Sequence, residues 1–138
     1  MHVGIAVASD DGLVVATVRD ADSKSLGTIA REARELALRV REGAATPQDL
    51  TGATFTVSNL GMYGMTAITA MINPPQAAIL GVGAARATLA RDDDGEIVDR
   101  QMLTLTLSCD HRILNGADGS RYLFDVRQIL ENPLRLSL

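Results

Sequence analysis

Apolar residues, many of them β-branched, fill two short runs near the start of the chain. The runs cover residues 3–8 (VGIAVA) and 13–18 (LVVATV), and the turn-forming sequence Ser-Asp-Asp-Gly lies between them. Short β-branched runs on either side of such a turn are typical of paired strands. The pattern therefore predicts an N-terminal hairpin.

A helical period follows between residues 23 and 42. Apolar side chains recur there every three or four positions, Arg and Glu occupy the other face, and Gly43 stands where a C-terminal cap belongs. The sequence Thr46-Pro47-Gln48-Asp49 then combines a capping hydroxyl, a proline suited to a first helical turn and an acid three residues after the threonine. We expect one long helix and, after it, a single helical turn.

The second half of the chain mixes strand and loop patterns. Residues 54–58 (TFTVS) predict a strand that runs into a glycine-containing loop at 59–64, and residues 76–84 (QAAILGVGA) predict another strand after the Asn73-Pro74-Pro75 break. A turn at 92–95 precedes a long alternating strand at 102–108, and residues 117–131 predict a helix that ends at Asn132-Pro133. The order β-β-α-β-β-β-β-α, without an internal repeat, indicates a mixed α/β fold.

Composition narrows the class of protein. A chain of 138 residues fits one domain, and its net charge of -4, without a run of Lys or Arg, argues against nucleic-acid binding. No stretch approaches eighteen uninterrupted apolar residues, so we expect no membrane span. Two histidines and one cysteine cannot complete a four-ligand zinc site without carboxylates, and a lone cysteine makes no internal disulfide. We therefore expect a chain in a soluble, reducing compartment, without a structural metal.

His111 is the candidate for proton transfer, because it follows the strand predicted at 102–108 and precedes a turn. An imidazole titrates near neutral pH and can deprotonate a thiol and return the proton. The structural alternative is a hydrogen-bonded turn histidine beside an Asp110–Arg112 ion pair. Cys109 could be a nucleophile, but a leucine-flanked cysteine on a strand more often packs.

Ser58 ends the strand predicted at 54–58 and has two interpretations. Its hydroxyl could donate a hydrogen bond to a developing oxyanion, or it could cap the loop that follows. The glycines in that loop lack the spacing of a dinucleotide-binding fingerprint, and no helical pattern follows at once. Nucleotide binding at this loop is therefore not expected.

Three segments together resemble the catalytic domain of the dihydrolipoamide acyltransferases. They are TFTVSNLGMYG at 54–64, INPPQAAILGVG at 72–83 and DHRILNGA at 110–117, and the likeness extends over essentially the whole chain. The resemblance implies an α/β chloramphenicol-acetyltransferase-like mixed sheet flanked by helices. It also implies the core component of a 2-oxoacid dehydrogenase complex, located in a bacterial cytoplasm or a mitochondrial matrix.

The resemblance implies roles for three residues. His111 would be the general base that takes the thiol proton, and Ser58 of a neighbouring subunit would hydrogen-bond the tetrahedral oxyanion. Asn115, at a position that often carries aspartate in this family, would orient and support the site. The domain would bind no cofactor of its own, since coenzyme A and the lipoyl group are its substrates and thioester exchange needs no metal.

The same resemblance implies partners and domain limits. We expect a homotrimer within a larger cubic or dodecahedral core, together with the 2-oxoacid decarboxylase and dihydrolipoamide dehydrogenase components, and no nucleic-acid partner. Family domains carry a further region before the segment that starts at Val3, so residues 1–138 are expected to be a single partial catalytic domain, without a lipoyl or subunit-binding domain.

Three functions remain open at this point. The first is an acyltransferase that moves an acyl group from S-acyldihydrolipoamide to coenzyme A. The second is a truncated, non-catalytic trimeric assembly module. The third, which the Asn-Pro-Pro-Gln segment disfavours, is an acyltransferase acting on a small hydroxyl or amine. No residue decides among acetyl, succinyl and branched-chain acyl groups.

Overall fold

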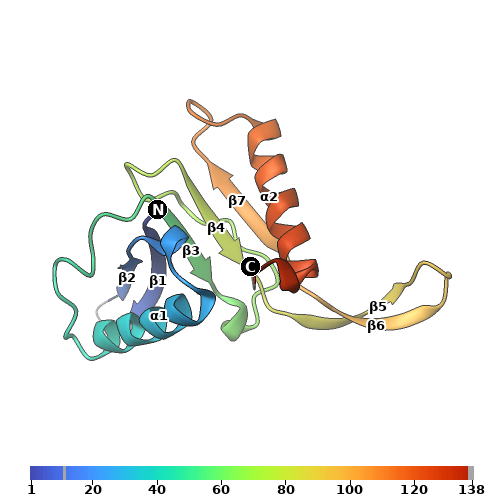
Figure 1. Cartoon of the computed structure of the whole chain (residues 1–138), viewed down its shortest axis with the longest axis horizontal. Helices are drawn as coiled ribbons and strands as arrows, with labels where there is room; N and C mark the ends of the chain where they lie inside the picture. The colour runs from blue at the N-terminus through green and yellow to red at the C-terminus, as the bar shows by residue number, and fades with distance from the viewer. Residues whose placement is uncertain (11, 137–138) are drawn as a thin grey trace.

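A computed structural model describes residues 1–10 and 12–136, and it contains a mixed sheet, two long helices and a projecting hairpin (Figure 1). The helices are α1 (Leu26–Arg41) and α2 (Gly116–Glu131), and three short 3-10 turns cover Ala21–Ser23, Gly61–Tyr63 and Pro133–Leu136. The strands are β1 (Val3–Ser9), β2 (Gly12–Val18), β3 (Phe55–Asn59), β4 (Ala78–Val82), β5 (Arg86–Arg91), β6 (Ile97–Met102) and β7 (Leu105–Cys109).

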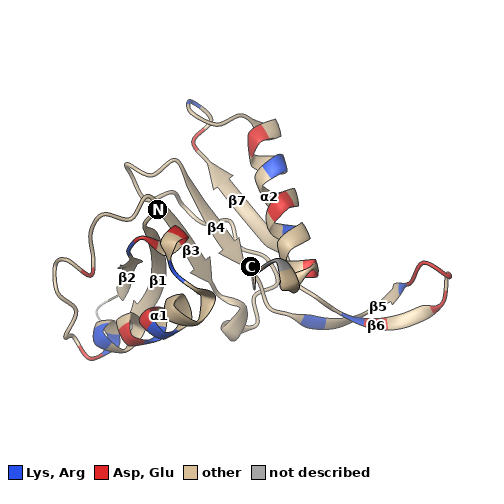
Figure 2. Cartoon of the chain, viewed as in Figure 1, with Lys and Arg blue, Asp and Glu red and all other residues tan. Residues whose placement is uncertain are grey.

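Five strands form the main sheet in the order β2-β1-β3-β4-β7. The three central strands are parallel to one another, and the two edge strands, β2 and β7, are antiparallel to their neighbours. Strands β5 and β6 pair only with each other and project from the body as a two-stranded arm (Figure 1). Charged residues of both signs line this arm, and its tip is acidic (Figure 2).

Helix α1 closes the core over β1 and β2. Ser25 caps its N-terminus by accepting a hydrogen bond from the Thr28 backbone N–H, as its side-chain type favours. Leu36 and Val40, one helical turn apart, are buried against the sheet, and each contributes about 1.5 to 3 kcal/mol by leaving water. The buried core consists of Val7, Ala16, Val18, Leu36 and Val40.

Helix α2 lies on the same face of the sheet as α1. Side chains of residues paired across neighbouring strands point to one face. One such row runs across the sheet from the strand under α1 to the strand under α2, through Ile5, Val57, Leu80 and Leu107. Gly119 of α2 faces β7, where a Cβ would make an ordinary contact 3.5 Å from the Cys109 Sγ.

The opposite face of the sheet carries small and polar side chains, Ser58 among them. Gly4 and Thr56 are paired on it, and the Thr56 hydroxyl donates to the Gln76 side-chain oxygen at 2.6 Å. The irregular segment that contains Ile68 covers part of this face, since a Cβ on Gly81 would come within 3.2 Å of the Ile68 side chain. The sheet therefore lies between a helical layer and an irregular layer.

Most of the predicted elements are confirmed. The N-terminal hairpin forms, although Asp11 of its predicted turn lies outside the described residues, and both long helices form within three residues of their expected limits. The segment after Thr46 makes hydrogen-bonded turns, with the Asp49 N–H donating to the Thr46 carbonyl at 2.9 Å, but no helix.

The single strand predicted at 102–108 is wrong, as is the count of four strands between the helices. Met102 ends β6, β7 begins at Leu105, and five strands separate the helices. The break arises because β6 pairs only with β5 in the arm, whereas β7 pairs with β4 in the main sheet. The Thr104 carbonyl, at the crossing between the two sheets, accepts from the Gly83 N–H at 3.0 Å.

Candidate active site

His111 lies in the turn that connects β7 to α2, as the sequence predicts. Its side chain is exposed, and none of the described residues forms a hydrogen bond with its imidazole. It borders a pocket between the end of β7 and the first turns of α2, lined by Leu107, Cys109, His111, Leu114, Asn115, Gly116, Gly119, Ser120 and Leu123. The ring is therefore free to act on a bound group.

Asn115 borders the same pocket and caps α2. Its side-chain oxygen accepts from the backbone N–H groups of Ala117, at 2.9 Å, and Asp118, at 3.0 Å. The Asp118 carboxylate in turn accepts from the Asn115 N–H at 3.3 Å, which completes a capping box. Hydrogen bonds from Arg121 and from the Asn115 backbone lower the pKa of Asp118. The cap fixes the Asn115 amide at the rim of the pocket.

Asp110 and Arg112 flank His111 and form the ion pair considered at the sequence level. The Arg112 guanidinium donates to both Asp110 oxygens, with the shortest distance at 2.7 Å. Hydrogen bonds from the Arg112 side chain and backbone lower the pKa of Asp110 to about 2. The carboxylate is thus ionised at neutral pH.

Ser58 does not approach His111 within one chain. It is buried in β3, where it pairs with Gly81, while Asp110 aligns with Ala77 at the other end of β4. At about 3.3 Å per residue, this offset separates Ser58 from the His111 turn by roughly 13 Å along the strands, in addition to the width of two strand spacings. Ser58 also points to the face away from α2, so one chain cannot bring both side chains to one reacting atom.

Ser58 lines a hydrophobic pocket on the face of the sheet opposite the two helices. Ser58 borders it together with Ala6 and Ile79 from the sheet and Ile68 and Met71 from the covering segment. The sequence predicts the serine itself but not these neighbours, because the covering segment has no regular pattern.

Cys109 faces the His111 pocket from β7. It is a free, half-buried thiol whose Sγ faces Gly119 of α2 and lies next to Leu107. This placement fits the interpretation of Cys109 as a packing residue.

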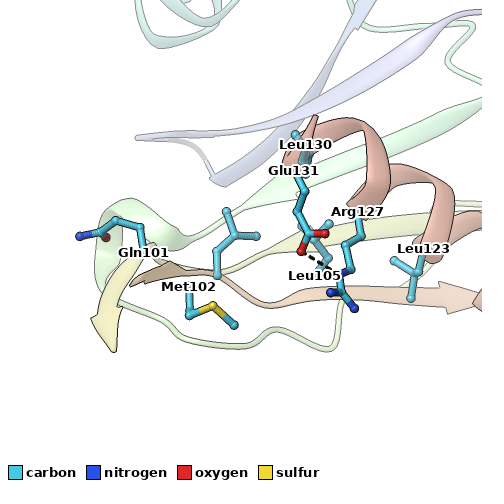
Figure 3. Close-up of a pocket in the computed structure, with 8 residues that line it drawn as sticks. Gln101, Met102, Leu105, Leu123, Arg127, Leu130 and Glu131 are labelled. Atoms are coloured by element: carbon cyan, nitrogen blue, oxygen red, sulfur yellow. Dashed lines mark hydrogen bonds and ion pairs between the residues drawn. The ribbon is translucent and has the colours of Figure 1, made fainter. Parts of the chain in front are cut away.

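An apolar groove extends along α2 away from His111 (Figure 3). Leu123 borders both this groove and the His111 pocket, and the Arg127–Glu131 ion pair, with 2.8 Å between its nitrogen and oxygen, stands at its edge (Figure 3). Sequence reasoning assigned no function to the residues that line this groove. For those on α2 the signal is helical spacing, since Leu123, Arg127 and Leu130 recur every three or four positions and so lie on one face.

The described residues hold no cluster of three or more His, Cys, Asp or Glu suited to a metal ion. Within that part of the chain, every helix is too short or too polar to cross a membrane.

Comparison with known proteins gives one family. The sequence model of the 2-oxoacid dehydrogenase acyltransferase catalytic domain matches residues 1–138. The succinyltransferase component of the Rickettsia typhi 2-oxoglutarate dehydrogenase complex is 42% identical over 138 residues, which are 99% of this chain and 34% of the relative. The mitochondrial acetyltransferase component of the Dictyostelium discoideum pyruvate dehydrogenase complex is 40% identical over 140 residues, which are 100% of this chain and 22% of the relative.

Solved structures agree with the sequence comparisons. Azotobacter vinelandii dihydrolipoamide acetyltransferase, in which the catalytic roles of a serine, a histidine and an asparagine were investigated, superposes with a TM-score of 0.93 at 39% identity. That match covers 100% of this chain and 56% of the solved chain. A truncated catalytic core from Thermoplasma acidophilum matches with a TM-score of 0.85 at 37% identity, over 96% of this chain and 57% of the solved one. The chain thus spans 34% and 22% of these two curated relatives and somewhat more than half of these solved cores.

Proposed function

Because this chain belongs to the family of 2-oxoacid dehydrogenase acyltransferase catalytic domains, we propose that it moves an acyl group between S-acyldihydrolipoamide and coenzyme A. The observation that carries the proposal is the pocket at the start of α2, which His111 and Asn115 share in a chain matched by the family over its whole length.

His111 is the general base of the proposed reaction. Its imidazole takes the proton from the coenzyme A thiol, and the thiolate sulfur attacks the thioester carbonyl to form a new carbon–sulfur bond. Collapse of the tetrahedral intermediate breaks the bond to dihydrolipoamide, whose departing sulfur receives the proton from the imidazolium. Positioned general-base catalysis of this kind contributes about 10² to 10⁴ in rate.

Ser58 supplies the oxyanion donor from a second chain. Its hydroxyl donates a hydrogen bond to the oxygen that becomes negative in the tetrahedral intermediate, and one such donor contributes roughly 3 to 4 kcal/mol. Because Ser58 and His111 lie on opposite faces and at opposite ends of one sheet, a shared site requires two chains to meet.

Asn115 orients the site from the N-terminus of α2. Its side-chain oxygen is used by the helix cap, so its amide nitrogen is the group that remains to face the pocket. The Azotobacter enzyme supports the pairing of His111 with Asn115, because its investigated histidine and asparagine are also four positions apart.

Assembly and partners follow the relatives. One solved neighbour is the cubic core of a pyruvate dehydrogenase multienzyme complex, which has a TM-score of 0.93. For this chain we propose a homotrimer within such a core, with 2-oxoacid decarboxylase and dihydrolipoamide dehydrogenase as partners, in a bacterial cytoplasm or mitochondrial matrix. Coenzyme A and the lipoyl group are substrates, and a succinyltransferase and an acetyltransferase match almost equally well, so both acyl groups are candidates for transfer.

The test is acyl transfer from acetyl-coenzyme A and from succinyl-coenzyme A to free dihydrolipoamide, on samples of known oligomeric state. We expect His111→Ala to lower turnover by about 10² to 10⁴-fold because the thiol loses its base. We expect Ser58→Ala to lower it by roughly 10² to 10³-fold because the oxyanion loses one donor.

His2→Ala is the matched control, since His2 is the only other histidine and lies in the N-terminal segment before β1. It should turn over like the parent chain. A His111→Ala variant that keeps parental turnover would exclude His111 as the base.

The second candidate is a non-catalytic assembly module. It is favoured by one observation, namely that Ser58 and His111 lie at opposite ends of the sheet, so a single chain forms no complete site. A well-folded oligomer without turnover and without coenzyme A binding would support this candidate, whereas turnover that depends on His111 would exclude it.

A further inference from the structure

The carboxylate of Asp110 spans the backbone of His111. Its Oδ1 accepts from the Arg112 backbone N–H at 3.0 Å, so the side chain of one residue binds the residue two positions later. Such a side-chain turn encloses the residue between them, here His111, in a hydrogen-bonded ring.

The Arg112 side chain closes the same turn from outside. Its Nε lies 3.0 and 3.2 Å from the two Asp110 oxygens, and a terminal nitrogen lies 2.7 Å from Oδ2. This two-pronged geometry restricts both side chains more than a single point contact would. Asp110 therefore holds Arg112 at the backbone and at the guanidinium simultaneously.

The backbone of Asp110 ties the turn to the sheet. Its N–H donates to the Ala77 carbonyl at 2.8 Å, beside the first residue of β4. Its carbonyl accepts from the N–H groups of Ile113, at 3.0 Å, and Leu114, at 2.9 Å. Asp110 thus connects the sheet to the backbone N–H groups of the three residues that follow His111.

The His111 imidazole has no hydrogen bond to any described residue, so its direction depends on the backbone that carries it. We propose that Asp110, through its contacts with Arg112, is a positioning residue that holds His111 in the orientation needed for proton transfer. This inference rests on the proposed function and adds to it a residue that does not itself touch substrate.

The Asp110–Arg112 ion pair affects the position of His111 more than it affects the free energy of unfolding. The Arg112 side chain is 88% exposed and the Asp110 side chain 17% exposed, and an ion pair with one solvated partner contributes modestly to the free energy of unfolding. Variants at Asp110 should therefore fold, while a displacement of the base by about 1 Å can lower a rate by roughly 10²-fold.

The kinetic test compares three variants with the parent in the acyl-transfer assay. Asp110→Ala removes both the turn and the ion pair, and we expect kcat to fall by about 10²-fold while KM changes by less than about threefold. Asp110→Asn keeps an oxygen for the Arg112 N–H, so we expect it to recover most of the loss and to remain within about tenfold of the parent. Arg39→Ala breaks another Arg–Asp ion pair, between Arg39 of α1 and Asp49, at the other end of the sheet from His111, and should leave kcat unchanged.

A spectroscopic test is independent of turnover. In histidine-labelled protein, the imidazole NMR signals of His111 should shift and average in Asp110→Ala because several ring orientations become populated. The signals of His2 in the same sample should stay unchanged.

A parent chain without turnover would overturn the proposed function, while the His111 signals would still decide the positioning role. Parental His111 signals in Asp110→Ala, or a parental kcat in an active protein, would overturn that role.

Discussion

Gly83 lies where the chain crosses from the main sheet toward the projecting arm. A side chain at this position would overlap the Thr66 carbonyl oxygen and lie 2.7 Å from the Thr66 carbonyl carbon. The Gly83 N–H is also bound to the Thr104 carbonyl at 3.0 Å, so the backbone cannot move away without losing a hydrogen bond. Close packing of this kind makes the glycine a steric requirement.

Gly83→Ala should therefore lower the free energy of unfolding by about 3 kcal/mol, at the upper end of overpacking effects. Gly27→Ala, in the first turn of α1 with open space around it, should instead be stabilising by about 0.5 kcal/mol. Urea denaturation of both variants measures the difference. Equal midpoints would show that the crossing relaxes at no cost.

Asp110 makes stability depend on pH in the acid range. Its folded pKa of about 2 lies below the ordinary value of 3.8, so ionised Asp110 favours the folded state. This contribution is complete only above about pH 5, well above the ordinary value, and is lost as the pH falls toward 2. In urea denaturation at pH 5, 4 and 3, Asp110→Asn should lose less stability on acidification than the parent. An identical loss in both proteins would contradict the assignment.

The sequence predicts the site at the level of residue type. His111 stands out because a titratable ring follows a strand and precedes a turn, whereas Asn115 is indicated only by the resemblance to the acyltransferase family. The spatial relation between Ser58 and His111 does not follow from the pattern. It depends on strand order, because one residue of register decides which face of a sheet a side chain takes.

At the scale of elements, α2 depends on its N-terminal cap. All of the residues of α2 are described, and none of them is fully buried. Even the large apolar side chain of Phe124 is 58% exposed. A helix with so little burial gains more from capping than a core helix does, since packing supplies less of its stability. The cap is also the element that fixes Asn115.

Asn115→Ala should lower the free energy of unfolding by about 1 kcal/mol, because two backbone N–H groups lose their acceptor. Asn115→Asp should stay close to the parent, since a carboxylate accepts the same bonds and is favoured at a helix N-terminus. Thermal and urea unfolding of the two variants measure this ordering. A stable Asn115→Ala protein would show that the Asp118 side of the box suffices.

The sequence predicts the limits of an element well where a single hydrophobic period runs through it, as in α1 and α2. It predicts them poorly where the chain passes from one sheet to the other. The alternation of Thr104, Thr106 and Ser108 with leucines continues the arm pattern without interruption. The break after Met102 comes from pairing with different partners, β5 on one side and β4 on the other. Such long-range pairing leaves no mark in a local period.

At the scale of the whole molecule, the projecting arm exposes apolar side chains. Leu89 is 71% exposed and Ile97 is 64% exposed. Ile97 pairs with Arg91, two residues after Leu89 on β5, so both apolar side chains are on one face of the arm. An isolated two-stranded hairpin is marginally stable in water, and exposed apolar groups of this kind mark surfaces that contact other chains.

Replacing both residues, Leu89→Ser with Ile97→Ser, should therefore shift the proposed trimer toward smaller species in sedimentation velocity. Asp93→Asn with Asp94→Asn, in the turn at the tip of the same arm, is the matched control and should sediment like the parent. An unchanged distribution in the serine variant would show that the arm is not part of the subunit interface.

The placement of Ser58 and His111 at opposite ends and faces of one sheet has a consequence for gene dosage. In the proposed trimer, a closed ring of three chains, each chain contributes its histidine to one site and its serine to another. One chain that lacks both side chains would therefore disable two sites of an otherwise intact ring. In cells that produce equal amounts of both chains, random assembly leaves about one quarter of the sites intact rather than half. Two alleles that each lack only one of these residues would rescue each other when expressed together.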